Sequence, residues 1–305
     1  MSAPVPFAKL SGAGNDHVCL DNRDGRFDAM LASPARVGRF ARTLCHRGTG
    51  IGADGIIFAD ACDDRLRGDV GVQFYEPDGA PAELCGNGAA CFARWALDNG
   101  WADREVVRIA TPAGKVRGRR ADGDYIRVCI PAPRDVETDV AITAAGTQCS
   151  CDVAVTGVPH AVVYVDDINE VDMIHQAPAI RHHERFQPRG MNVNYTQVLG
   201  EGHLAVRTYE FGVEAETLAC GTGSATAAYL AALRFGWPQE YHDMSRPVLV
   251  DVRSGDTLRV YFHLDEHRCP GHVCLETVVR FIYTGVLHPQ LVARAMAHDP
   301  SAPEA

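Results

Sequence analysis

Two stretches of the chain, Cys85-Gly86-Asn87-Gly88 and Cys220-Gly221-Thr222-Gly223, are copies of one pattern. Each copy follows a strand-like run that ends in a Tyr-Glu pair and a short turn. Each is followed by an alanine-rich helical pattern that ends at a Gly-Trp pair, at 100–101 and at 236–237. A strand, a cysteine motif and a helix thus recur in the same order, which predicts a chain built from two similar halves.

The helices after the two motifs are apolar on every side, which is typical of a helix buried within its domain. Strand-like runs surround each of them in the sequence, for example Val106-Val107-Arg108-Ile109 and Thr257-Leu258-Arg259-Val260. We therefore expect an α/β fold in which each half is a sheet around one central helix. Pro131-Ala132-Pro133-Arg134 has the composition of a linker, so the halves are predicted at 1–132, with Cys85, and at 133–275, with Cys220.

Composition excludes several classes of function. The 305 residues carry a net charge of −10, and the basic footprint of a nucleic-acid-binding protein is missing. No apolar run is long enough to cross a membrane, and the N-terminus has no signal-peptide pattern, so a cytoplasmic protein with no membrane partner is expected. Eleven cysteines, an odd number, do not suggest a disulfide framework, and most should be small buried side chains.

The paired cysteines suggest acid–base chemistry. A cysteine that opens a helix lies in a positive potential beside unsatisfied N–H groups, and both lower its pKa. Two such helix ends would bind a carboxylate, and one thiolate and one thiol could remove and return a proton on opposite faces of a carbon. The alternatives are that Cys85 and Cys220 are ordinary buried cysteines, or that they form a redox disulfide.

Two other patterns resemble cofactor or metal sites. The glycine-rich run 47–55 is followed by a strand-like segment, whereas a dinucleotide fingerprint would need a helix there. The run 263–274 contains several histidines and cysteines, but its spacing matches no standard zinc pattern and reads better as a polar loop. We expect no cofactor and no metal; the non-catalytic alternative is a thiol switch or metal-binding module.

Residues 83–91 and 216–223 closely resemble the two active-site motifs of the diaminopimelate epimerase family. The resemblance covers nearly the whole chain. It extends to further segments, namely 12–16, 50–55, 77–79, 111–114, Pro159-His160 and Asn192.

The resemblance implies a fold of two pseudo-symmetric halves, each a β-barrel-like sheet around a central helix, with a tail after about 276 returning to the first half. It also implies an isomerase that needs neither pyridoxal phosphate nor metal, with Cys85 and Cys220 as the acid–base pair. His160 and Glu210 match pocket positions near the cysteines, unless they are only a hydrogen-bonded buried pair. A homodimer is a family-level expectation. The substrate-binding positions that follow are Asn15, Glu76, Gly86, Asn87, Asn192, Phe211, Gly221 and Thr222.

The sequence departs from the family where the far end of the substrate is bound. Phe211 stands where the family has an arginine that grips the distal carboxylate, and Glu76 and Val158 replace two asparagines; only Asn192 remains. Losing a bidentate arginine and gaining a carboxylate would leave an anionic substrate end unpaired. We therefore expect a free amino acid without a distal carboxylate, such as histidine or another aromatic or basic amino acid. The alternative is a true diaminopimelate epimerase, which converts the LL- to the meso-isomer.

Overall fold

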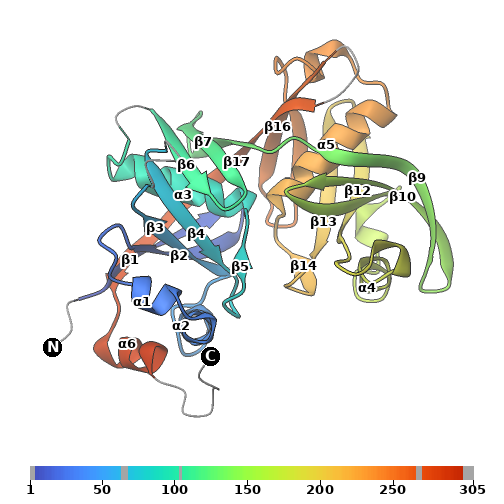
Figure 1. The fold of residues 1–305 in the computed structure, drawn as a ribbon. Helices are drawn as coiled ribbons and strands as arrows, with labels where there is room; N and C mark the ends of the chain where they lie inside the picture. Colours follow the sequence, from blue (N-terminus) through green and yellow to red (C-terminus); the bar gives the residue numbers. More distant parts are fainter. Residues whose placement is uncertain (1–3, 63–67, 103–104, 266–269, 298–305) are drawn as a thin grey trace. The chain divides into compact units, whose positions relative to one another are not determined.

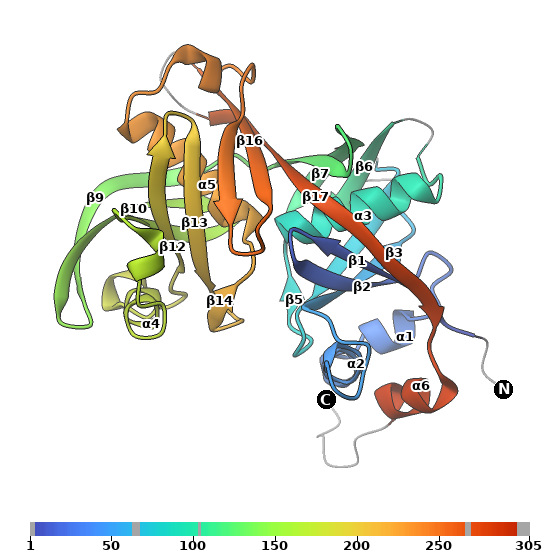
Figure 2. The same ribbon diagram turned by 180° about the vertical axis from the view of Figure 1, so that it is seen from behind.

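The computed structural model describes residues 4–62, 68–102, 105–265 and 270–297. The chain divides into two compact units, Met1–Arg120 with Val279–Ala305, and Ala121–Val278. Each unit combines a sheet with helices (Figures 1 and 2). The expected α/β fold of two similar halves is confirmed.

The first unit begins with an antiparallel pair of strands and is closed by the end of the chain. Its strands are β1 (Pro6–Gly12), β2 (Asn15–Asp21), β3 (Gly55–Asp60), β4 (Val70–Tyr75), β5 (Pro81–Ala82), β6 (Val106–Thr111), β7 (Gly114–Arg120) and the second part of β17 (Pro270–Val286). Its helices are α1 (Asp28–Leu31), α2 (Pro34–Cys45), α3 (Gly86–Asp98) and α6 (Pro289–Met296). The tail returns to this unit because β17 pairs with β1 from Pro6↔Val286 to Gly12↔Val279.

The second unit contains the remaining elements. Its strands are β8 (Tyr125–Ile130), β9 (Arg134–Ala144), β10 (Thr147–Thr156), β11 (Val158–Tyr164), β12 (Asn192–Gly200), β13 (His203–Glu210), β14 (Ala215–Thr217), β15 (Val248–Val252), β16 (Thr257–Leu264) and the first part of β17. Its helices are α4 (Gln176–Arg181), α5 (Gly221–Arg234) and the 3₁₀ turns η1 (Ile168–Glu170), η2 (Glu184–Phe186) and η3 (Gln239–Tyr241).

The two units repeat one order of strand pairing. In the first, β1–β2 is antiparallel, β2–β3 parallel, β3–β4 antiparallel, β4–β6 parallel and β6–β7 antiparallel. In the second, β10–β11, β11–β12, β12–β13, β13–β15 and β15–β16 follow the same alternation. The short strands β5 and β14 pair with β4 and β13 at equivalent places. The duplication seen in the two cysteine motifs therefore extends to the whole topology.

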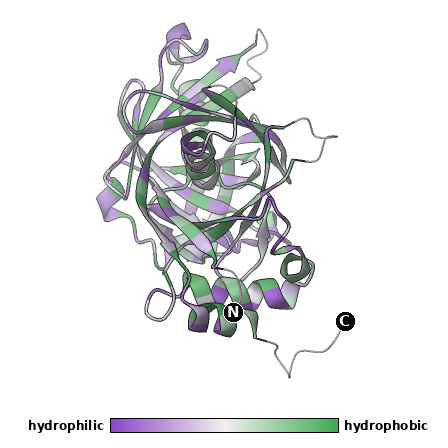
Figure 3. Ribbon diagram, turned by 90° about the vertical axis from the view of Figure 1, so that its left-hand side faces the viewer, coloured by the Kyte–Doolittle hydropathy of each residue, from purple (hydrophilic) through white to green (hydrophobic). Residues whose placement is uncertain are grey.

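Each sheet wraps around its alanine-rich helix. Helix α3 contacts β1, β2, β3, β4, β6 and β7, and α5 contacts β10, β11, β12, β13, β15 and β16. Figure 3 shows a helix end-on within a ring of strands. The contact is close enough to require small residues, because a Cβ at Gly118 of β7 would lie 2.4 Å from the Cβ of Ala93. The predicted burial of both helices is confirmed.

Both central helices end in the same way. Gly100 and Gly236 have positive φ angles of 66° and 62°, a conformation that glycine adopts without steric cost. The N–H groups of Trp101 and Trp237 donate to the carbonyls of Ala96 and Ala232. This is the hydrogen-bond pattern of a Schellman C-cap, which explains why a Gly-Trp pair marks both ends.

The predicted linker at 131–134 lies inside the second unit, between β8 and β9. The chain instead passes between the units at 120/121 and at 278/279. The reason is a long-range pairing: β8 is antiparallel to the first part of β17, from Ile130↔Val273 to Tyr125↔Val278. No local sequence pattern carries that pairing.

A buried carboxylate on β17 forms ion pairs with arginines of β8 and β16. Glu276 has a side chain that is 3% exposed and is bound by Arg127, at 2.6 Å, and by Arg259, at 3.3 Å. The two guanidinium groups also lie over aromatic rings, Arg127 over Tyr261 and Arg259 over Tyr125. The three strands are thus joined by a charge network between their side chains as well as by their backbones.

We expect Arg127→Ala to lower the free energy of unfolding by about 3–5 kcal/mol, because it leaves the buried Glu276 carboxylate without its nearer cation. Urea unfolding followed by circular dichroism would measure this. The matched control is Arg134→Ala, since Arg134 is 69% exposed and pairs with the exposed Asp135, which predicts a change below about 1 kcal/mol. Equal effects of the two variants would contradict the assignment.

Cysteine pairing differs from the expectation at one place. Cys129 and Cys274, directly opposite each other on β8 and β17, form a disulfide. Cys85 and Cys220 are not in a disulfide bond. Cys220 and four further cysteines outside disulfides are buried, as predicted for most of the cysteines: Cys19, Cys45, Cys91 and Cys151. Cys269 lies outside the described residues. Within the described ranges, no helix is both long and apolar enough to span a membrane.

Candidate functional site

Each cysteine of the repeated motif is the N-cap of a central helix. Cys85 precedes α3, and its sulfur accepts a hydrogen bond from the Gly88 N–H at 3.3 Å. Cys220 precedes α5, and its sulfur accepts from the Gly223 N–H at 3.4 Å. Both cysteines have extended backbone angles, as an N-cap requires. The two thiols therefore have matching local surroundings, each at the positive end of a buried helix.

In the first unit, a glycine-rich turn lies against the start of α3. A Cβ on Gly12 would lie 3.0 Å from the Asn87 carbonyl oxygen and 3.2 Å from its Cβ, so the close approach depends on glycine. Asn15 is the β2 partner of Gly12. The structure thereby brings Asn15 and Asn87 to the end of the helix that carries Cys85 and Gly86.

The Asn15 side chain carries a buried polar atom at this helix end. Its Oδ1 atom is buried and has no hydrogen-bond partner among the residues that the structure describes. A buried amide oxygen without a hydrogen bond destabilises the folded state unless a ligand or a water molecule donates to it. This agrees with the predicted substrate-binding role of Asn15.

Glu76 lies in the turn between β4 and β5. Its N–H donates to the Ala80 carbonyl, and its carbonyl accepts from the Gly79 N–H, both at 2.9 Å. The preceding strand reaches the helix start, since a Cβ on Gly88 would lie 3.2 Å from the Phe74 ring. The half-buried Glu76 therefore leaves β4 beside the helix end that carries Cys85.

In the second unit, His160 and Asn192 are neighbours across the parallel strands β11 and β12. His160 is fully buried, and its Nε2 lies 3.0 Å from the Thr222 hydroxyl oxygen. Burial lowers the pKa of His160 to about 3, so the ring is neutral at neutral pH. The Thr222 oxygen in turn lies 3.5 Å from the Cys220 sulfur. His160 thus reaches the thiol through Thr222.

The end of β13 carries the other predicted pocket residues. Glu210 is its last residue and accepts a hydrogen bond from the Thr217 hydroxyl at 2.5 Å. Asn192 uses its Oδ1 to accept from the Phe211 N–H at 2.8 Å. Phe211 and Asn192, both predicted to bind the substrate, are therefore held together by a hydrogen bond.

Two arginines lie beside the Phe211 ring, and no local sequence pattern predicts them there. The guanidinium carbon of Arg181 lies 4.6 Å from the Phe211 ring centroid, and that of Arg189 lies 5.7 Å away. Arg181 is buried and donates to the Arg189 carbonyl and to Glu214. Arg189 is exposed. Both come from the segment between β11 and β12, so only the fold brings them to β13.

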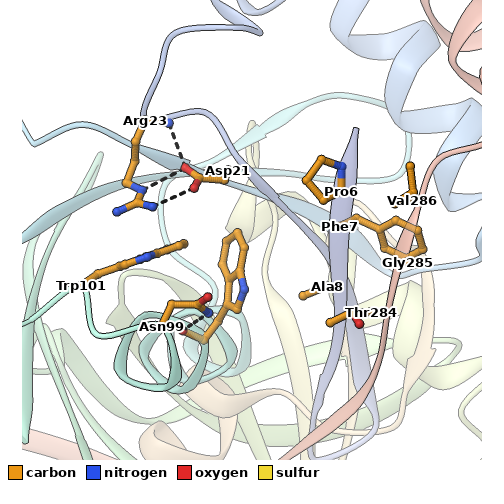
Figure 4. Close-up of a pocket in the computed structure, with 11 residues that line it drawn as sticks. Pro6, Phe7, Ala8, Asp21, Arg23, Asn99, Trp101, Thr284, Gly285 and Val286 are labelled. Atoms are coloured by element: carbon orange, nitrogen blue, oxygen red, sulfur yellow. Dashed lines mark hydrogen bonds and ion pairs between the residues drawn. The ribbon is translucent and has the colours of Figure 1, made fainter. Parts of the chain in front are cut away.

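A separate hollow lies at the other end of α3. It has a volume of about 450 Å³, and Figure 4 shows the side chains that line it, including Phe7, Asp21, Arg23, Trp101 and Val286. Trp95 and Asn99 also line it, at the C-terminal end of the helix. A helix of this length places them roughly 15–20 Å from Cys85. This hollow is therefore distinct from the surroundings of the cysteine.

The run 263–274 was predicted to be a polar loop, but both of its ends, 263–264 and 270–274, belong to strands. β16 ends at Leu264 and β17 begins at Pro270, while His267 and Cys269 lie outside the described residues. Across the described part of the chain, no group of three or more His, Cys, Asp or Glu side chains has a metal-binding arrangement.

Several solved structures share this fold. A phenazine biosynthesis protein of the PhzF family from Bacillus anthracis matches with a TM-score of 0.71 at 13% identity, covering 94% of this chain and 99% of its own. A hydroxyproline epimerase from Agrobacterium vitis matches with a TM-score of 0.67 at 18% identity, covering 95% and 94%. The chain therefore has the same fold as these two solved structures.

Sequence comparison identifies the family. The diaminopimelate epimerase family model matches residues 7–124 and 153–267. A diaminopimelate epimerase from Aquifex aeolicus (strain VF5) is 39% identical over 263 residues, covering 86% of this chain and 91% of the relative. One from Hydrogenobaculum sp. (strain Y04AAS1) is 33% identical, covering 92% and 98%. The chain belongs to the diaminopimelate epimerase family.

Family membership confirms that the protein is a cofactor-independent isomerase of the racemase or epimerase type. It also removes the main support for the non-catalytic alternative, a thiol switch or metal-binding module.

Proposed function

We propose that the protein inverts the α-carbon of a free amino acid, with Cys85 and Cys220 as the two acid–base groups. The observation that supports this proposal is the matched pair of cysteines outside any disulfide, each the N-cap of a buried central helix. A positioned thiolate is a competent base near neutral pH. In one direction, one sulfur takes the α-proton and the other sulfur gives its own proton to the opposite face of the carbon. The reverse reaction exchanges the two roles.

The remaining predicted residues then bind and orient the amino acid. The N-terminal N–H groups of α3 and α5, at Gly86, Asn87, Gly221 and Thr222, would hold the α-carboxylate, because a helix N-terminus favours an anion. Binding the carboxylate there also stabilises the negative charge that develops when the α-proton leaves. Asn15 and Glu210 offer polar groups to the rest of the substrate backbone.

For the substrate side chain, we propose an amino acid without a distal carboxylate, with histidine as the leading candidate. Phe211 offers an aromatic face, and Glu76 could accept a hydrogen bond from an imidazole N–H. The guanidinium groups of Arg181 and Arg189 beside Phe211 would repel a second cation, which favours neutral histidine over lysine, ornithine or arginine.

A true diaminopimelate epimerase is the alternative, and one observation favours it. Arg189 is exposed beside Phe211. Its guanidinium could therefore bind the distal carboxylate, which the side chain of Phe211 cannot bind. The relatives quoted above are named for that activity. The two candidate functions differ in the far end of the substrate: the first requires that it has no carboxylate, and the second requires a carboxylate there.

Isomer analysis would test the proposed function and separate the candidates. The purified protein is incubated in deuterated water with each L-amino acid and with LL-diaminopimelate, and the isomers and the α-deuterium content are measured. Inversion of L-histidine or another substrate without a distal carboxylate supports the first candidate, and formation of meso-diaminopimelate supports the second. Inversion of none of them would contradict the proposed function.

We also propose that the protein is a homodimer in the cytoplasm, and that the second part of β17 contributes to the dimer contact. Three apolar side chains on this strand are exposed: Ile282 (49%), Tyr283 (43%) and Val286 (60%). Val286 also lines the hollow at the end of α3. A cluster of exposed apolar side chains on one strand is typical of a surface that another protein covers.

We expect Tyr283→Arg to convert a dimer into a monomer, because it places a charge in an apolar contact. Light scattering coupled to gel filtration would measure the mass. Ile174→Arg is the control, since Ile174 is 78% exposed and belongs to the second unit, far from β17 in sequence. A wild-type protein that is monomeric at all concentrations would contradict the proposed dimer.

A further inference from the structure

A chain of buried polar side chains leads from the strands of the second unit to the Cys220 sulfur. Besides His160 and Thr222, it includes Asn194 on β12 and Thr208 on β13. All four are at most 5% exposed. Asn194 is pressed against the helix start, because a Cβ on Gly223 would lie 2.1 Å from its Oδ1.

The contacts of Asn194 fix the orientation of its amide. Its Nδ2 lies 3.0 Å from the Ala161 carbonyl oxygen, which can only accept a hydrogen bond, so the amide nitrogen must face it. Its Oδ1 accepts from the Thr208 hydroxyl at 3.0 Å. The same Nδ2 also lies 3.2 Å from His160 Nδ1. Because Nδ2 is a donor only, Nδ1 must be the accepting nitrogen of the imidazole.

This assignment decides where the proton of the neutral ring sits. With Nδ1 as acceptor, the hydrogen is on Nε2, and Nε2–H donates to the Thr222 hydroxyl oxygen at 3.0 Å. The Thr222 hydroxyl hydrogen is then free to point at the Cys220 sulfur, 3.5 Å away. The donor direction therefore runs from Asn194 through His160 and Thr222 to the sulfur.

We infer that Asn194 and Thr208 are positioning residues which, by holding His160 as its Nε2–H tautomer, direct the Thr222 hydroxyl as a donor to Cys220. Together with the Gly223 N–H, this gives the sulfur two donors, which stabilises the thiolate relative to the thiol. The inference deepens the proposed function, on which it rests for the role of Cys220 in catalysis. The donor chain itself is a property of the protein without substrate.

Other ionisable groups on the strands around α5 have different partners. Asp152 on β10 pairs with Arg234, at the C-terminal end of the helix. Glu210 accepts from Thr217. His160 is an ionisable group that contacts Thr222 directly, and because its ring is neutral at neutral pH it acts there as a fixed dipole.

The test compares three variants: one that reverses the donor direction of these hydrogen bonds, one that removes the Thr222 hydroxyl, and one that leaves the hydrogen bonds unchanged. Asn194→Asp places a carboxylate, an acceptor only, opposite Nδ1, so the ring should become the Nδ1–H tautomer and Nε2 should accept from Thr222. Thr222→Val removes the hydroxyl and leaves the tautomer unchanged. Thr156→Val is the matched control: it removes a buried hydroxyl that bonds Thr226 and does not contact His160.

Two measurements on the full chain without substrate read out the result. ¹⁵N chemical shifts of labelled histidine report the His160 tautomer, with His160→Gln assigning the signal. Peptide mass spectrometry reports the iodoacetamide reaction of Cys220 against pH. We expect Nε2–H in the wild type and in Thr156→Val, and Nδ1–H in Asn194→Asp. The pH midpoint of alkylation should rise by roughly one unit in both Asn194→Asp and Thr222→Val, because the thiolate loses one donor.

An Nδ1–H ring in the wild type would overturn the inference, and so would a wild-type midpoint in Thr222→Val. Both results stand even if Asn194→Asp fails to fold. Neither measurement uses an amino-acid substrate, so a failure of the proposed racemase activity would be seen separately, in the isomer assay.

Discussion

Replacing Cys85 or Cys220 by alanine is expected to lower kcat/KM for inversion by roughly 10³-fold or more, because each variant lacks one of the two proton-transfer groups. Replacing both should be little worse than replacing one, since residues that act as a unit are not additive in their effects. The measurement is the rate of isomer formation together with α-deuterium incorporation in deuterated water.

Cys149→Ser is the matched control. Cys149, like Cys85, is a half-buried cysteine outside any disulfide, but it lies on β10. It should retain inversion near the wild-type rate. If Cys85→Ala or Cys220→Ala kept full activity, the two-base assignment would be wrong, whatever the substrate.

The second large effect is expected at Phe211. Phe211→Arg should lower kcat/KM for histidine and raise the rate with LL-diaminopimelate, changing the ratio of the two by roughly 10²-fold. The aromatic contact is lost, and a guanidinium that can bind a distal carboxylate is gained. Adding Glu76→Asn should increase the change further, since it removes a carboxylate that would repel the diaminopimelate end.

Val213→Arg is the control for this experiment. Val213 is exposed (46%) in the same turn as Phe211, so the variant adds the same charge nearby without changing the residue that Asn192 holds. A different result is a wild-type enzyme that already prefers diaminopimelate and a Phe211→Arg variant with the same ratio of kcat/KM for the two substrates. That result would mean that another group, such as Arg189, binds the distal carboxylate.

The features of the fold that could be predicted from sequence are those with a local physical cause. A cysteine before glycines caps a helix, an alanine-rich run can be surrounded by strands, and a Gly-Trp pair forms a Schellman cap. The unit boundary could not be predicted in this way, because the pairing of β8 with β17 joins residues that are far apart in the chain. Pro131 and Pro133 look like a linker but only separate β8 from β9.

The same distinction applies to the candidate site. Cys85, Cys220, His160 and Asn192 stand in recognisable motifs. Asn194 and Thr208 do not: they are polar residues at core-facing positions of β12 and β13, and a polar residue at such a position was the signal that could have drawn attention to them. Arg181 and Arg189 gave no signal, since only the tertiary fold places them beside Phe211.

The return of β17 to β1 also affects how the protein is completed during synthesis. The second unit, Ala121–Val278, is one continuous stretch, so all of its strands are synthesised before the last strand of the first unit. The first unit, although its cysteine motif is made early, has an unpaired β1 edge until residues 279–286 emerge. Multidomain chains commonly fold their N-terminal domain first; here the half that is translated first is the half that must be finished last.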